Sequence, residues 1–161
     1  MALTKTKKKE VLDSVEKIIK DSKTVVFVNF HGIKVADSTV IRRKLKSEGV
    51  GFLVAKKTLT KRAFDSGKFA GTMPELDGEL GLAYSKDLTS PAREVYEFTK
   101  KYKNCLAILG GVFDGKYMTK LEMTDIALIP PMKTLQGIFV NIINSPIQGF
   151  VIVLDEIAKK V

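Results

Sequence analysis

The spacing of apolar residues predicts helices and strands in regular alternation. Residues 4–20 place Val11, Val15, Ile18 and Ile19 three to four positions apart or adjacent on one face, the pattern of an amphipathic helix. Residues 24–30 are instead a short run of β-branched and apolar side chains, which is typical of a buried strand. The same criteria predict further strands at 50–55, 76–84, 104–113 and 116–118, and further helices at 37–48, 57–66, 91–101 and 119–128.

Turn and cap residues mark the ends of these elements. Asp37 or Ser38 can cap the second helix, and Gly49 can end it. Thr119 can cap the helix at 119–128, and Asp114-Gly115 is the signal of a two-residue hairpin. The alternation of strands and helices predicts an α/β fold, in which a mixed sheet that is parallel at least in part packs against helices.

The dipeptide Pro130-Pro131 interrupts this alternation. We expect residues 1–130 to form an N-terminal globular α/β domain. We expect residues 131–161 to form a protruding C-terminal helical tail that is broken near Pro146.

The tail contains 21 consecutive residues without a charge, 134–154. A helix of about 20 apolar residues can span a bilayer, so a membrane-surface protein that uses this segment is one alternative. Glycine, proline and polar residues interrupt the segment, which favours a soluble helix that folds back on its own domain or docks on partner helices. Its apolar residues form two helical stripes, separated by residues 144–146, which suggest two similar docking segments. The stripes consist of Leu135, Ile138, Phe139, Ile142, Ile143, Phe150, Val153, Leu154, Ile157 and Val161.

Composition and charge point to a polyanionic partner. Hydrophobic residues make up 45% of the 161 residues, too many for a disordered chain. The formal net charge is +9, which favours nucleic acid first and an acidic membrane surface second. Residues 1–70 carry a net +10, residues 71–130 a net −2 and residues 131–161 a net +1. We therefore expect the polyanion-binding surface in the first 70 residues.

Basic residues in this region cluster on predicted helices. Arg42, Arg43 and Lys46 share one broad helix face. Lys56, Lys57 and Thr58 open the following helix, where free amides and a partial positive charge suit a phosphate. The alternative is a set of solvated helix faces. Contacts of this kind would position folded RNA by its shape rather than by its base sequence. The candidate contacts are Lys7, Lys8, Lys9, Arg42, Arg43, Lys46, Lys56, Lys57, Thr58, Lys61 and Arg62.

Catalytic chemistry is weakly represented. Residues from Gly110 to Lys116 match seven positions of a phosphate-loop motif, but Tyr117 stands where Ser or Thr would hold magnesium. A small nucleotide-binding enzyme is therefore a second alternative. His31 is the single histidine and Cys105 the single cysteine, which excludes an intrachain disulfide and a thiolate metal site. We expect no enzyme activity, no cofactor and no bound metal, and a location in the cytoplasm.

Several motifs resemble those of large-subunit ribosomal protein ten, the stalk-base protein of the bacterial ribosome. The stretch from 42 to 63 is the most specific, and the tail is similar by position and pattern. The motifs are Gly32-Ile33-Lys34-Val35, Ile41-Arg42-Arg43-Lys44-Leu45 with Gly49, Val54-Ala55-Lys56-Lys57-Thr58-Leu59 with Ala63, residues 78–85, Gly110-Gly111 and Ile129-Pro130.

This resemblance implies a structural constituent of the large ribosomal subunit. The α/β domain would bind large-subunit rRNA in the GTPase-associated region, beside ribosomal protein eleven and away from any membrane. The C-terminal helix would carry dimers of the acidic stalk protein, ribosomal protein seven/twelve, which recruit translation GTPases. The two stripes of the tail imply two such dimers. The family usually has Asn where this chain has Lys57, and a lysine can meet a phosphate but cannot accept a hydrogen bond.

Overall fold

The protein is an α/β structure with one further helix at its C-terminus. The computed structural model describes residues 5–67, 69–102 and 105–160, so expectations on Thr4, Asn104 and Val161 fall outside the described residues. The chain divides into two compact units, Met1–Ile129 and Pro130–Val161.

The first unit contains every helix and strand that the sequence predicted for it, with ends that differ by at most four residues. The elements are α1 (Lys5–Asp21), β1 (Thr24–Phe30), α2 (Val35–Ser47), β2 (Gly51–Val54), α3 (Lys57–Ser66), β3 (Leu80–Ser85), α4 (Ser90–Lys101), β4 (Leu106–Phe113), β5 (Lys116–Met118) and α5 (Lys120–Ala127).

The five strands form one sheet in the order β2-β3-β1-β4-β5, and all four strand pairs are antiparallel. The expectation of a partly parallel sheet is therefore wrong for these strands. The connections β1-α2-β2 and β3-α4-β4 each join strands that run in the same direction. A strand of the other connection lies between the members of each pair, which is the split β-α-β arrangement. Strands and helices alternate along the chain both in a partly parallel sheet and in this split arrangement.

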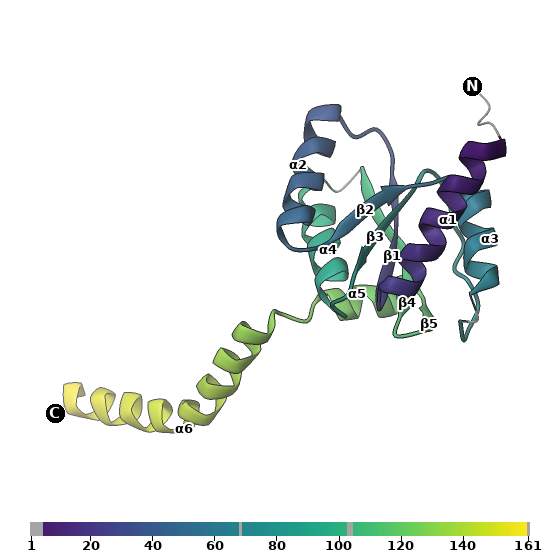
Figure 1. Ribbon diagram of the computed structural model, residues 1–161. Helices are drawn as coiled ribbons and strands as arrows, with labels where there is room; N and C mark the ends of the chain where they lie inside the picture. Colours follow the sequence, from purple (N-terminus) through teal and green to yellow (C-terminus); the bar gives the residue numbers. More distant parts are fainter. Residues whose placement is uncertain (1–4, 68, 103–104, 161) are drawn as a thin grey trace. The chain divides into compact units, whose positions relative to one another are not determined.

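Helices cover both faces of the sheet, with α2 and α4 on one side and α1 and α3 on the other (Figure 1). Alternate residues of the central strand β1 supply both cores, as strand geometry requires. Val26 packs in a cluster with Leu45 of α2. Phe27 packs on the opposite face, where its ring meets that of Phe64 edge to face at 5.1 Å. These two cores fix α2 and α3 on opposite faces of the sheet.

The predicted hairpin at Asp114-Gly115 is confirmed. Both residues have positive φ, 46° and 79°, and Phe113 pairs with Lys116 across the turn. Residues from Gly110 to Phe113 belong to β4, whose backbone pairs with β1 and β5. A phosphate loop leads from a strand into a helix, so the hairpin contradicts the nucleotide-binding alternative.

Two helix caps show where local sequence signals succeed and fail. Thr119 caps α5 as predicted, in a capping box in which its N–H donates to Glu122 Oε2 at 2.8 Å. The predicted cap of α2 is wrong, because this helix begins at Val35 with Lys34 as its N-cap residue. Asp37 lies in the first turn, where a carboxylate is favourable to the helix dipole, and it accepts a hydrogen bond from Tyr102 Oη at 3.4 Å.

The second unit is built on a single 29-residue helix, α6 (Met132–Lys160), with Pro146 at its centre. The predicted break near Pro146 is wrong, because the helix continues through this residue. Figure 1 shows instead a bend midway along α6. Proline lacks an N–H and its ring clashes with the preceding turn, which explains a bend at this position.

Candidate nucleic-acid interface and C-terminal helix

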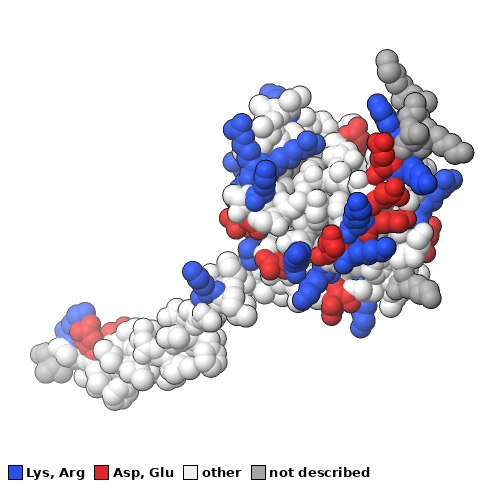
Figure 2. Space-filling view, viewed as in Figure 1, with Lys and Arg blue, Asp and Glu red and all other residues white. Residues whose placement is uncertain are grey.

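The structure places the basic residues of α2 on its outward face. Arg42, Arg43 and Lys46 are exposed, whereas Ile41 and Leu45 are buried against the sheet. Figure 2 shows Lys and Arg side chains gathered over α2. Among the side chains that the structure describes, none of the three basic groups forms an ion pair with a carboxylate. This face is therefore available to an external anion.

Lys44 has a different environment from its neighbours. Its Nζ donates a hydrogen bond to Glu97 Oε2 at 3.0 Å and lies 3.7 Å from Glu94 Oε2, both on α4. The ammonium group also lies over the Phe98 ring, 5.3 Å from its centroid. The hydrogen bond to Glu97 raises the pKa of Lys44. Lys44 thus joins α2 to α4, although 47% of its side chain remains exposed.

Aromatic contacts connect the basic face of α2 to the centre of the domain. The guanidinium carbon of Arg42 lies over the Phe52 ring, 5.9 Å from its centroid. Phe52 meets Phe30 edge to face at 6.4 Å. Because Phe30 is the last residue of β1, this chain of contacts leads from α2 to the end of the sheet where α3 begins.

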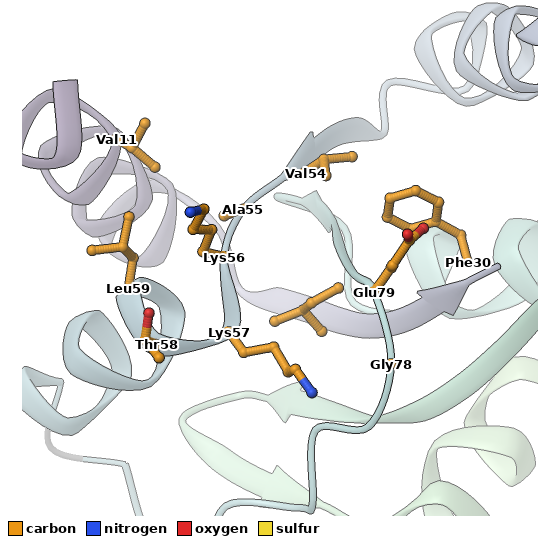
Figure 3. Close-up of a pocket in the computed structure, with 11 residues that line it drawn as sticks. Val11, Phe30, Val54, Ala55, Lys56, Lys57, Thr58, Leu59, Gly78 and Glu79 are labelled. Carbon is orange, nitrogen blue, oxygen red and sulfur yellow. The ribbon is translucent and has the colours of Figure 1, made fainter. Parts of the chain in front are cut away.

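A groove of about 810 Å³ lies at this end of the sheet, and we call it the α3 groove. Its walls come from α1, the ends of β1 and β2, the start of α3 and the segment before β3 (Figure 3). It is lined by Val11, Phe30, Val54, Ala55, Lys56, Lys57, Thr58, Leu59, Gly78, Glu79 and Leu80. The sequence predicted Lys56, Lys57 and Thr58 as a phosphate site, and the structure places these three residues together on the groove.

The N-terminus of α3 presents its first amides at the groove. Lys56 is the N-cap residue, in extended conformation and without a side-chain cap. The first amides of an α-helix have no partner within the helix, so those of Lys57 and Thr58 can donate to an anion. The helix dipole and two exposed lysines add positive charge at the same point.

The remaining predicted contacts lie around this centre. Lys61 and Arg62 are exposed one turn further along α3. Lys7, Lys8 and Lys9 are exposed near the start of α1, just before Val11, which lines the groove. Farther along α1, acidic and basic side chains are interspersed, as Figure 2 shows.

The residues that the sequence analysis missed are those opposite the lysines, namely Phe30, Gly78 and Glu79. They reach the groove because β1 pairs with β3, and this pairing was not evident from the sequence. One local signal existed, the glycine at 78. In the structure Gly78 has a φ of +75°, and a Cβ there would lie 2.4 Å from Asn29 Nδ2. The positive φ favours glycine at this position, whereas the Asn29 side chain can shift to relieve the contact.

The second unit presents a different surface. The described members of the two predicted stripes are exposed, from 38% for Leu135 to 65% for Phe139, Ile142 and Phe150. Val140, Ile147, Val151 and Ile152 are exposed as well and were not included in the stripes. By length and composition alone, residues Met132–Lys159 are also apolar enough to cross a membrane.

In residues 5–67, 69–102 and 105–160, no three side chains of His, Cys, Asp or Glu gather to hold a metal ion. His31 is exposed in the connection between β1 and α2. Its backbone N–H donates a hydrogen bond to the backbone carbonyl of Cys105 at 2.9 Å.

Comparison with known proteins identifies the family of this chain. The family model described as Ribosomal protein L10 matches residues 3–100. The Large ribosomal subunit protein uL10 of Oceanobacillus iheyensis is 30% identical over 155 residues, which cover 96% of this chain and 93% of the relative. The proteins of that name from Bacillus licheniformis and Pelotomaculum thermopropionicum are 30% and 28% identical, over 95% and 99% of this chain and 92% and 91% of the relatives. The chain belongs to the ribosomal protein L10 family.

Proposed function

We propose that this protein connects large-subunit rRNA to the acidic stalk protein, with residues 1–130 as the rRNA-binding domain and residues 131–161 as the stalk-binding tail. As a member of the ribosomal protein L10 family, it is a structural, non-enzymatic component of the large ribosomal subunit and works in the cytoplasm, on the ribosome. The observation that carries the finer proposal is the division of surface chemistry: exposed cations lie on the first unit, whereas the second has a long, exposed and mostly uncharged helix.

The rRNA contact is assigned to the exposed cations of α2 and α3 and to the first turns of α1. The described cations of this set have no carboxylate partner among the residues that the structure describes, so an RNA phosphate does not have to displace one of these carboxylates. Each phosphate contact releases condensed counterions, so rRNA affinity should fall steeply with salt concentration. Ribosomal protein eleven is expected as a neighbour at this surface, by analogy with the family.

The stalk contact is assigned to α6. Its two halves repeat a short pattern, Leu135-Gln136-Gly137 and Ile147-Gln148-Gly149, each followed by apolar residues. The repeat is 12 residues long, which corresponds to about 18 Å along a helix. A bend at Pro146 separates the two halves. This repetition supports two docking segments, each of which binds one stalk-protein dimer through apolar helix packing.

A membrane contact is the competing use of α6, since the helix is long and apolar enough to enter a bilayer. Flotation of the full chain with liposomes, in the presence and absence of the stalk protein, distinguishes the two. When liposomes and stalk protein are both present, we expect the protein to remain bound to the stalk protein. Stable flotation of the stalk-bound protein would favour the membrane.

Charge reversal tests the assignment of the two surfaces. The double substitution Arg42→Glu and Lys57→Glu should weaken binding of an rRNA fragment from the GTPase-associated region, while binding of the stalk protein stays unchanged. Lys120→Glu, at an exposed residue of α5, is the matched control and should leave both activities intact. If the double variant lost both activities together, a folding defect would explain the result and the surface assignment would fail.

A further inference from the structure

The α3 groove is larger and more apolar than phosphate contacts require. Val11, Val54, Leu59 and Leu80 contribute hydrocarbon surface, and Phe30 contributes an aromatic ring. Its volume of about 810 Å³ lies within the range of pockets that enclose small ligands. A phosphate held at the N-terminus of α3 would leave this apolar part of the groove unused.

The polar groups of the groove are divided between its two sides. Figure 3 shows the Lys57 side chain extending toward the segment at Gly78, whereas the Glu79 carboxylate lies beside the Phe30 ring and points away from Lys57. Cations and free amides therefore lie at the α3 side, a carboxylate lies at the β1 side, and apolar surface lies between them. A nucleotide has the complementary order, with an anionic phosphate, a flat apolar base and amino groups at the base edge.

We propose that one unpaired nucleotide of the bound rRNA leaves its stack and inserts its base into the α3 groove. This inference rests on the proposed rRNA-binding function and adds a recognition mode to it. The phosphate lies at the amides of Lys57 and Thr58, the base packs against Phe30 and Val54, and Glu79 accepts a hydrogen bond from a base amino group. Unstacked bases are the usual targets of specific RNA recognition by aromatic side chains.

The path of the RNA strand beyond the inserted nucleotide follows from the aromatic contacts. Phe30 lies beside Phe52, and Phe52 lies under the Arg42 guanidinium. A strand that places its phosphate at Lys57 and crosses the groove thus meets Arg42 at the other side. The basic faces of α2 and α3 would then contact one continuous RNA strand. This geometry also predicts a preference for a base with an amino group, so uridine should bind worst at the inserted position.

The test uses the full chain and an rRNA fragment from the GTPase-associated region that carries 2-aminopurine at one unpaired position at a time. The fluorescence of 2-aminopurine rises when this base leaves the stack. Wild-type protein should therefore raise the fluorescence at one of the labelled positions. Val54→Trp should fill the groove and lower affinity at least about tenfold, the size of a lost base–aromatic stack. Val40→Trp is the control, because Val40 is similarly exposed but lies on α2 outside the groove.

An abasic residue at the responding position separates insertion from indirect effects. It should lower wild-type affinity to that of Val54→Trp and have little further effect on the variant. Glu79→Gln, at an exposed residue, is a second variant that does not depend on filling the groove, and it should reduce discrimination against uridine.

The outcomes distinguish this inference from the proposed function. If no position responds and Val54→Trp binds like wild type while Arg42→Glu with Lys57→Glu binds poorly, the groove is not a nucleotide site and the rRNA-binding function stands. The same result is expected if a protein segment occupies the groove. If wild-type protein does not bind the fragment at all, both proposals are wrong.

Discussion

Lys44 donates a hydrogen bond to Glu97 Oε2 at 3.0 Å and thereby joins α2 to α4. The exposed cations of the same helix, Arg42, Arg43 and Lys46, have no such partner among the described residues. Basic residues within five positions of one helix therefore have two different roles. Charge alone does not distinguish them, and the position of α4 does.

Removal of one cation at a time tests this difference. Arg43→Ala should weaken rRNA binding at all sequences alike and reduce the slope of log affinity against log salt by about 1. Lys44→Ala removes the same charge from the same helix, but it should change the slope much less because Lys44 faces α4. Binding titrations at several salt concentrations measure both slopes. Equal effects of the two substitutions would show that overall charge, not position, determines binding.

The two dimer sites on α6 predict a stepwise loss of stalk protein. A carboxylate in an apolar interface is costly to bury, so Phe139→Asp and Phe150→Asp should each remove one dimer and the double variant should remove both. Leu121→Asp, at an exposed apolar residue of α5, is the control and should retain both dimers. Light scattering of the purified complexes gives the stoichiometry. Loss of both dimers from either single variant would argue for one continuous site.

The close approach of β4 to α5 predicts a strict requirement for glycine at 111. A Cβ at Gly111 would lie 2.5 Å from the Val25 carbonyl oxygen and 2.4 Å from Met123 Cε. Gly111→Ala should therefore destabilise the first unit by about 1–3 kcal/mol. Gly137→Ala is the comparison: a Cβ there meets nothing within 4 Å, and helix propensity favours alanine by about 1 kcal/mol. Thermal unfolding should show a lowered midpoint for the first variant only.

The capping box of α5 predicts a pH dependence of stability in the acid range. The hydrogen bond from the Thr119 N–H, with a second from its hydroxyl, lowers the pKa of Glu122 below 4.5. A depressed carboxyl pKa stabilises the fold above the unfolded-state value, and this contribution is lost as pH falls through the folded-state value. The stability difference between wild type and Glu122→Gln should therefore shrink below pH 4.5. Denaturant titrations at pH 7 and in the acid range measure the stability of both proteins. A stability difference that does not depend on pH would contradict the assigned interaction.

Much of the fold could be predicted from the sequence because it depends on local patterns. The β-branched run at 24–30 became β1, and the Asp114-Gly115 dipeptide became the hairpin turn with both residues at positive φ. The sheet could not be predicted in the same way. Insertion of β3 between β1 and β2 depends on long-range pairing, such as that of Phe27 with Leu82, which leaves no local signal.

In the candidate interface, too, only the residues marked by a local sequence pattern could be predicted. Lys56, Lys57 and Thr58 were identified because adjacent residues at one helix start are visible in the sequence. Their opposite wall, with Phe30 and Glu79, was not identified because Phe30 ends β1 whereas Glu79 directly precedes β3, 49 positions later in the chain. The role of Lys44 was missed for the same reason, since Glu97 lies 53 residues away.

The mass of the complex formed by the full chain, the rRNA fragment and the stalk protein tests the two-surface account most directly. Native mass spectrometry should give one chain, one RNA fragment and two stalk-protein dimers. Arg42→Glu with Lys57→Glu should remove only the RNA, and truncation after Ser145 should remove only one dimer. A wild-type complex without RNA, or variants that lose RNA and stalk protein together, would contradict the account.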